Sequence, residues 1–131
     1  MFNNTDCIFC NKKGCKIILS NRYFFVIRDT AYPVTKFHTL IITNRHISNF
    51  FDLNNEELHN LNQILKDQEK ELLNLDKSIT GFNIGVNVGK DAGQSIMHCH
   101  IHLIPRRNGD VEDPRGGVRG VIPSKQKYER T

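Results

Sequence analysis

The sequence predicts a single α+β domain: a mostly antiparallel sheet of about five strands with one long helix. The chain has 131 residues, of which 38% are hydrophobic and 24% charged, enough to bury one core. Short β-branched and aromatic runs lie on both sides of one long amphipathic segment, an order typical of α+β domains. The sequence has no internal repeat, heptad array or low-complexity tract.

The strands are assigned from short apolar runs that stop at turn residues. They are residues 16–19, 23–27, 38–42, 81–88 and 96–104. The first two flank Ser20-Asn21-Arg22, which is typical of a hairpin, and the last two flank the glycine-containing link at residues 89–93. Pro105 is expected to end the last strand because proline lacks the backbone N–H that a ladder uses.

Residues 54–75 form the predicted helix. Asn54 can cap its first turn, and Glu57, three residues later, completes a capping box. Leucines then recur at helical spacing and predict an apolar stripe facing the core. The stripe consists of Leu58, Leu61, Leu65, Leu72 and Leu75, widened by Ile64.

Three of the six histidines fall within residues 98–102. On a strand, alternate side chains share a face, so His98, His100 and His102 are expected on one side. The opposite, core-facing set is Met97, Cys99, Ile101 and Leu103. Imidazoles in such a row suit two chemistries, metal binding and nucleophilic attack on phosphorus.

The residues before this strand favour nucleophilic attack on phosphorus over metal binding. Residues 87–95 offer glycines that let backbone N–H groups approach an anion, and Gln94 and Ser95 add side-chain donors. Metal binding alone does not need an anion cradle, whereas phosphoryl transfer depends on positioning and charge stabilisation.

Residues 93–105 resemble the signature of the histidine triad (HIT) family of nucleotide hydrolases and transferases, three histidines alternating with hydrophobic residues. The likeness extends over about residues 6–107 and includes Asp29, the run 38–42 and the segment 44–47. Cys99 stands where the family usually has an aliphatic residue. The resemblance implies a HIT-like fold, a homodimer and a covalent nucleotidyl-histidine intermediate, with no cofactor for the chemistry.

The same resemblance implies roles for individual residues. His100 is the expected nucleophile at the α-phosphate of a purine nucleotide derivative, and His102 assists the leaving group. The expected substrate-binding residues are Asp29 at the ribose and Asn87, Gly93, Gln94 and Ser95 at the phosphate. Water then releases a nucleoside monophosphate; the leaving group, whether amine, second nucleotide, sulfate or fluoride, stays open. His38 matches a family position near the active site and receives no role.

Cys7 and Cys10 form a C-x-x-C pair, which by itself fits zinc ligands, a redox pair or two unrelated thiols. In zinc-containing members of the family a similar pair joins two histidines, here His46 and His98. The resemblance therefore implies a closed, structural Cys2His2 zinc site, with Cys15 as a substitute ligand. His98 would then be a ligand that fixes the strand of His100.

The net charge of +4 is concentrated at the C-terminus. Residues 1–105 carry a net +1 and residues 106–131 a net +3. We expect a domain at residues 1–108 and a C-terminal arm at residues 109–131, docked near the active site or the dimer partner. We expect a nucleotide partner, no nucleic acid and no membrane, because the longest apolar runs are far short of a span.

The start of the chain lacks a secretory pattern, so a cytoplasmic location is expected. Two other functions remain open: a nucleotide-binding regulatory module with little turnover, and a metal-dependent hydrolase that uses the histidine cluster.

Overall fold

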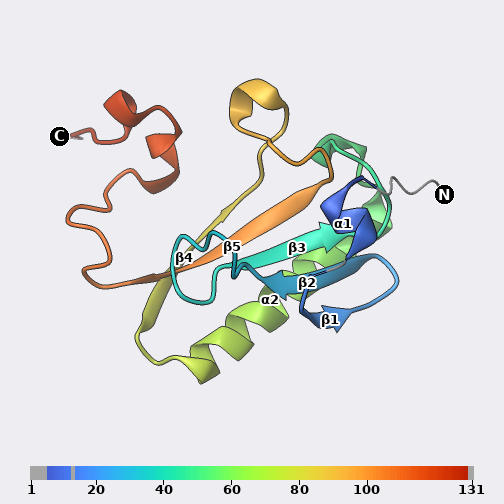
Figure 1. Cartoon of the computed structure of the whole chain (residues 1–131). Helices are drawn as coiled ribbons and strands as arrows, with labels where there is room; N and C mark the ends of the chain where they lie inside the picture. The colour runs from blue at the N-terminus through green and yellow to red at the C-terminus, as the bar shows by residue number, and fades with distance from the viewer. Residues whose placement is uncertain (1–5, 13, 130–131) are drawn as a thin grey trace.

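The computed structural model describes residues 6–12 and 14–129, and its architecture confirms the predicted fold class. Five antiparallel strands form one sheet in the order β1-β2-β3-β5-β4 (Figure 1). The strands are β1 Ile17–Ser20, β2 Phe24–Arg28, β3 Thr39–Thr43, β4 Ile79–Gly85 and β5 His100–Arg107. The helices are α1 Ile8–Asn11, α2 Asn55–Leu75 and four 3-10 turns: η1 Phe50–Asp52, η2 Lys90–Ala92, η3 Gly117–Val121 and η4 Pro123–Lys125.

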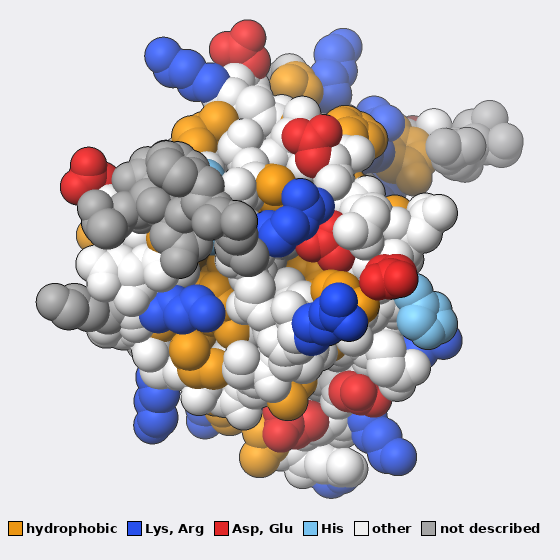
Figure 2. Space-filling view, turned by 90° about the vertical axis from the view of Figure 1, so that its right-hand side faces the viewer, with side chains coloured by type: hydrophobic (Ala, Val, Ile, Leu, Met, Phe, Trp, Pro, Cys, Tyr) orange, Lys and Arg blue, Asp and Glu red, His pale blue; other side chains and the backbone are white. Residues whose placement is uncertain are grey.

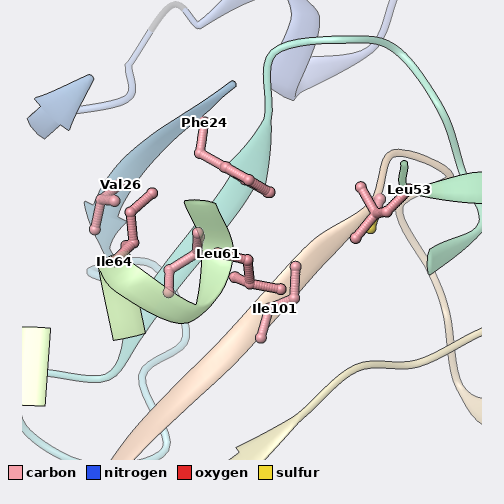
Figure 3. Close-up of a cluster of buried hydrophobic side chains, with 8 residues drawn as sticks. Phe24, Val26, Leu53, Leu61, Ile64 and Ile101 are labelled. Carbon is pink, nitrogen blue, oxygen red and sulfur yellow. The ribbon is translucent and has the colours of Figure 1, made fainter. Parts of the chain in front are cut away.

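The long helix α2 covers one face of the sheet (Figure 1). Leu61 and Ile64 pack against side chains of β2 and β5, among them Ile101 (Figure 3). The predicted stripe is partly wrong, because the first turn of the helix buries Glu57 in place of Leu58, and Leu75, the last residue of the helix, is exposed. The observed buried stripe is Glu57, Leu61, Ile64, Gln68 and Leu72.

The start of α2 confirms the predicted capping box. The Asn54 side chain accepts from the Glu57 N–H at 2.8 Å, and the Glu57 carboxylate accepts from the Asn54 N–H at 3.0 Å. Arg45, from the segment after β3, also donates to Glu57, at 2.7 and 3.1 Å. Glu57 is buried, so this ion pair and the cap together satisfy a charge that would otherwise be costly to bury.

The last strand differs from the prediction at both ends. It begins at His100, so His98 and Met97 lie outside it, and Met97 is exposed instead of facing the core. It continues through Pro105 to Arg107. Proline is tolerated there because β3 stops opposite Leu103, so no β3 carbonyl requires a Pro105 N–H. Within the strand the predicted alternation holds, with Ile101 and Leu103 buried.

The face of the sheet opposite α2 is called the histidine face below. Strand pairing places Ile27, Leu40, His102 and Gly85 in one row across β2, β3, β5 and β4. His100 lies in the neighbouring row beside Ile42. At one end of this face, Phe9 of α1 packs on the apolar residues of β2 and β3. At the other end, residues of β4 and β5 line a cavity together with the C-terminal arm, which lies to the side of β4 (Figure 1).

The C-terminal arm, residues 109–129 of the described chain, has internal structure of its own. Arg119 donates to the carbonyl oxygens of Lys125 and Gln126 at 2.8 and 3.3 Å. Gln126 in turn donates to the Arg115 carbonyl at 3.3 Å. Gly116 has φ +89°, and a Cβ there would lie 1.9 Å from the Gln126 carbonyl oxygen, so only glycine fits.

The side of the molecule drawn in Figure 2 does not carry a patch of charges of one sign. Basic and acidic side chains are interspersed over the side of the molecule drawn in Figure 2. Among the described helices, none has both the length and the hydropathy that crossing a bilayer requires.

Candidate active site

His100 is held in one tautomer by the backbone. Its Nδ1 lies 2.7 Å from the His98 carbonyl oxygen, which can only accept, so Nδ1 carries the proton. In the neutral ring, Nε2 is then left with a free electron pair. The Phe9 ring packs edge-on against His100, with ring centroids 5.2 Å apart, and limits the ring's rotation. This arrangement presents an unprotonated imidazole nitrogen, which is what a nucleophile requires.

His102 is oriented by a histidine from the neighbouring strand. The Val34 N–H donates to His38 Nδ1 at 3.0 Å, so the proton of neutral His38 is on Nε2. His38 Nε2 then donates to His102 Nδ1 at 2.9 Å. The proton of neutral His102 is therefore on Nε2, the nitrogen that is free to donate to a ligand. The chain Val34–His38–His102 thus makes His102 a hydrogen-bond donor.

Burial keeps this pair of imidazoles neutral. Desolvation, followed by the neighbouring His100 and His38, lowers the pKa of His102 to about 4. Desolvation also lowers the pKa of His38, which is 2% exposed. Asp29 opposes both shifts, because its Oδ2 lies 3.9 Å from His38 Nδ1. An anion bound beside His102 would add to the effect of Asp29 and favour the protonated ring.

One carboxylate oxygen of Asp29 accepts hydrogen bonds from the backbone, and the other faces the site. Its Oδ1 accepts from the N–H groups of Ala31 and Tyr32 at 3.1 and 3.0 Å, which shapes the turn after β2. Its Oδ2 is the oxygen directed toward His38. The carboxylate therefore has an oxygen that can accept from a ligand hydroxyl.

The loop of residues 87–95 contains both site residues and supporting residues. Asn87 lines a cavity together with His102, and the Asn87 amide nitrogen lies 4.0 Å from where a Gly93 Cβ would stand. Gln94 differs from the expectation, since its amide donates to the Ser48 and Ile96 carbonyls at 2.8 and 3.2 Å. Its Oε1 accepts from the Gly89 N–H, so Gln94 braces the loop and has no amide N–H left for an anion. Ser95 is exposed at the end of the loop.

A second cluster brings together the four predicted metal ligands. One donor atom from each of Cys7, Cys10, His46 and His98 lies within 4.8 Å of all the others. His98 Nδ1 is 3.4 Å from Cys7 Sγ, 3.5 Å from Cys10 Sγ and 3.1 Å from His46 Nδ1. Tetrahedral zinc separates such atoms by about 3.3–3.6 Å.

A hydrogen bond orients the His98 ring so that one of its nitrogens can coordinate a metal ion. It is fully buried, and its Nε2 donates to the Thr43 carbonyl at 2.7 Å, so Nδ1 is the nitrogen left for a metal. Two thiols and two imidazoles are the donor set of a closed zinc site, and the residues therefore fit the ion. His98 consequently lies with the cysteines and contributes to His100 through its carbonyl, not through its ring.

Sequence reasoning gave His38 no role, and it expected the C-terminal arm near the active site without identifying the cavity that they share. The role of His38 depends on β3 pairing with β5, which brings together residues 64 positions apart. The C-terminal residues Val118 and Val121 line a cavity of about 650 Å³ that also contains His38 and His102. A run of glycines, valines and arginines in the arm was the only signal of this contact.

Comparison with known proteins agrees with the fold. Residues 11–109 match the model of the HIT domain, and the chain belongs to the HIT family. An uncharacterised HIT-like protein of Methanocaldococcus jannaschii is 33% identical over 120 residues, covering 88% of this chain and 91% of its own.

Two solved structures add to the family assignment. A zinc-bound histidine triad family protein of Mycobacterium smegmatis superposes with a TM-score of 0.73 at 30% identity, covering 83% of this chain and 81% of its own. The diadenosine triphosphate hydrolase of Plasmodium falciparum gives a TM-score of 0.67 at 28% identity, covering 75% and 65%. The family thus includes nucleotide hydrolases, and a zinc-bound member is among those similar to this chain.

Proposed function

We propose that the protein is a nucleotide hydrolase or transferase that acts at the α-phosphate of a purine nucleotide derivative and releases a nucleoside monophosphate. The substrate would be a phosphoramidate or a dinucleoside polyphosphate. One observation carries the proposal: the His98 carbonyl fixes the His100 proton on Nδ1, so Nε2 can attack phosphorus. The similarity to a diadenosine triphosphate hydrolase supports the same reaction class.

The reaction would take two displacements. In the first, a bond forms between His100 Nε2 and the α-phosphorus while the bond to the leaving atom breaks. The substrate's negative charge favours protonated His102, which gives its Nε2 proton to the leaving atom. In the second, water attacks the phosphorus, its proton passes to His102, and the electron pair of the P–N bond returns to His100.

The remaining residues would bind and orient the substrate. Asp29 Oδ2 would accept from a ribose hydroxyl, and Asn87, Gly93 and Ser95 would contact phosphate oxygens. Gln94 would support that loop from inside, through its bonds to the carbonyls of Ser48 and Ile96. His98 would act through its main chain. The chemistry would need no cofactor, since His100 supplies the nucleophile.

We further propose that Cys7, Cys10, His46 and His98 hold a structural zinc ion. The ion would supply cross-linking and no open coordination position for substrate, because all four ligands come from the protein. It would tie α1 to the residues that precede β5, and so support the carbonyl that orients His100. We also propose a homodimer in the cytoplasm, with residues 1–108 as the catalytic domain and residues 109–131 as an arm near the site.

The direct test is a search for the intermediate. The protein is mixed with an adenosine 5′-phosphoramidate or a dinucleoside polyphosphate. The reaction is stopped without acid, and the protein is analysed by intact-protein mass spectrometry. We expect an adenylyl adduct that His100→Ala abolishes and that His59→Ala, an exposed histidine on α2, retains. An adduct that survives His100→Ala contradicts the nucleophile. Tight binding without turnover would instead favour a regulatory module, and activity that a chelator removes from the folded protein would favour a metal-dependent hydrolase.

A further inference from the structure

The turn that leads into β3 carries a phenylalanine at a position that favours glycine. The His38 N–H donates to the Thr35 carbonyl at 3.1 Å and closes a turn of residues 35–38, called the anchored turn below. Phe37, the third residue of this turn, has φ +71°. A turn with a positive φ at its third residue usually carries glycine or asparagine there, because a Cβ makes this conformation unfavourable. Contacts of Phe37 must therefore offset the strain.

The Phe37 ring supplies one such contact. It packs against a buried cluster made of Leu72 on α2, Ile79 on β4 and Leu103 on β5. Neighbouring side chains of an extended segment point to opposite faces, so the ring lies on the α2 side of the sheet while His38 lies on the histidine face. Burial of the Phe37 ring on one face therefore fixes the backbone from which His38 projects on the other.

Hydrogen bonds from two further side chains join the anchored turn to β5. The Thr35 hydroxyl donates to the Pro105 carbonyl at 2.8 Å. The Arg107 guanidinium donates to the Lys36 carbonyl at 3.0 Å and to the Asp76 carboxylate at 2.9 Å. The two side chains of this ion pair are mostly buried, so solvent and salt screen the pair less than an exposed one. The anchored turn is thus held at three successive residues.

The anchored turn controls the orientation of His102 through His38. The Val34 N–H, directly before the turn, donates to His38 Nδ1 at 3.0 Å, and His38 Nε2 donates to His102 Nδ1 at 2.9 Å. Relaxation of Phe37 to a negative φ would rotate the backbone next to His38 and break this chain of hydrogen bonds. The His102 ring would then lose the bond that keeps its Nε2 directed toward a ligand.

We propose that Phe37 is a positioning residue for the reaction: its buried ring holds the anchored turn in the left-handed conformation, and the turn keeps His102 aligned to protonate the leaving atom. Arg107 supports the same turn from β5. This inference rests on the proposed function, and it adds residues that do not touch the substrate. Disturbing the turn should slow reactions whose leaving atom needs a proton more than reactions whose leaving group departs as a stable anion.

The test compares two substrates that share the adenylyl half. Adenosine 5′-phosphoramidate releases ammonia, whose nitrogen must gain a proton, whereas the p-nitrophenyl ester of adenosine 5′-monophosphate releases a stable anion. The measured quantity is the kcat/KM for the phosphoramidate divided by that for the ester, since kcat/KM reports the steps up to departure of the leaving group. Phe37→Ala keeps a Cβ but removes the ring, and it should lower this ratio about tenfold. Phe37→Gly also removes the strain, so its ratio should stay within about threefold of the wild type.

Phe82→Ala is the matched control, because Phe82 packs on the same buried cluster as Phe37 but lies in β4. It should leave the ratio within about twofold of the wild type. The order of the two Phe37 variants separates positioning from packing, because both lose the ring and glycine also loosens the chain. A glycine variant no better than the alanine variant, or the same fall in Phe82→Ala, overturns the inference and leaves the proposed function standing.

Arg107→Ala keeps the test decisive if circular dichroism shows that Phe37→Ala does not fold. It removes the donor to the Lys36 carbonyl without opening the apolar cluster, and it should lower the ratio in the same direction. An unchanged ratio in Arg107→Ala then overturns the inference. A wild-type chain that turns over neither substrate and forms no adduct overturns the proposed function, and the inference with it.

Discussion

Lowering the pH from 7 to 5 should destabilise the fold by an amount that His102 largely determines. Burial lowers the pKa of His102 to about 4, whereas an unfolded histidine titrates near about 6.5. Between these values the unfolded chain binds a proton that the folded chain does not, so acid favours unfolding. With these two pKa values, linkage gives a loss of about 2 kcal/mol between pH 7 and pH 5. The lowered pKa of His38 acts in the same direction.

Urea denaturation at the two pH values measures this loss. Unfolding is followed by far-UV circular dichroism, because the chain has no tryptophan for fluorescence detection. His102→Gln removes the titrating ring, so its loss between pH 7 and pH 5 should be smaller by about 2 kcal/mol. His59→Gln, on the exposed surface of α2, is the control and should keep the wild-type pH dependence. A His102→Gln protein with the same pH dependence as wild type refutes the reasoning.

Three further outcomes are expected. Glu57→Gln should lower the free energy of unfolding by about 1–3 kcal/mol in urea, because it weakens both the cap and the Arg45 ion pair, and an unchanged midpoint contradicts this. Cys10→Ser should lower bound zinc, measured by elemental analysis, and the melting temperature together; full zinc content excludes the cluster. Gly116→Ala should speed tryptic cleavage in the arm, whereas Gly81→Ala, where a Cβ would make an ordinary 3.8 Å contact with the Arg106 side chain, should not; equal digestion of both variants contradicts the arm's packing.

The parts of the fold that could be predicted are those set by neighbours in the sequence. The helix bounds, the Asn54–Glu57 cap and the alternation of Ile101 with His102 follow from residues within one or two turns or pleats. Gln94 could not be predicted to face inward, because its partners, the Ser48 and Ile96 carbonyls, depend on how the loop folds back. Pro105 within β5 depends likewise on where β3 stops.

The candidate site shows the same division. The histidine spacing and the C-x-x-C pair are local patterns, and the structure brings the four metal-ligand candidates within 4.8 Å. The tautomers are not local, because they depend on the Val34 N–H and on a hydrogen bond between β3 and β5. The cavity of about 650 Å³ depends on Val118 and Val121, which lie more than 30 positions along the chain from Ile84 of β4.

The bond from His100 to the His98 carbonyl has a consequence for how such a chain can change over evolution. The His98 ring belongs to the proposed metal site, whereas its carbonyl binds the proposed nucleophile, His100, and only the ring depends on residue type. Every amino acid carries the carbonyl. Descendants of this chain can therefore lose their metal ligands one by one while the reactive imidazole keeps its proton in the same place, provided the backbone there is supported by other packing. Under the proposed function, the loss of the metal site and the retention of the catalytic histidine would be separate events in evolution.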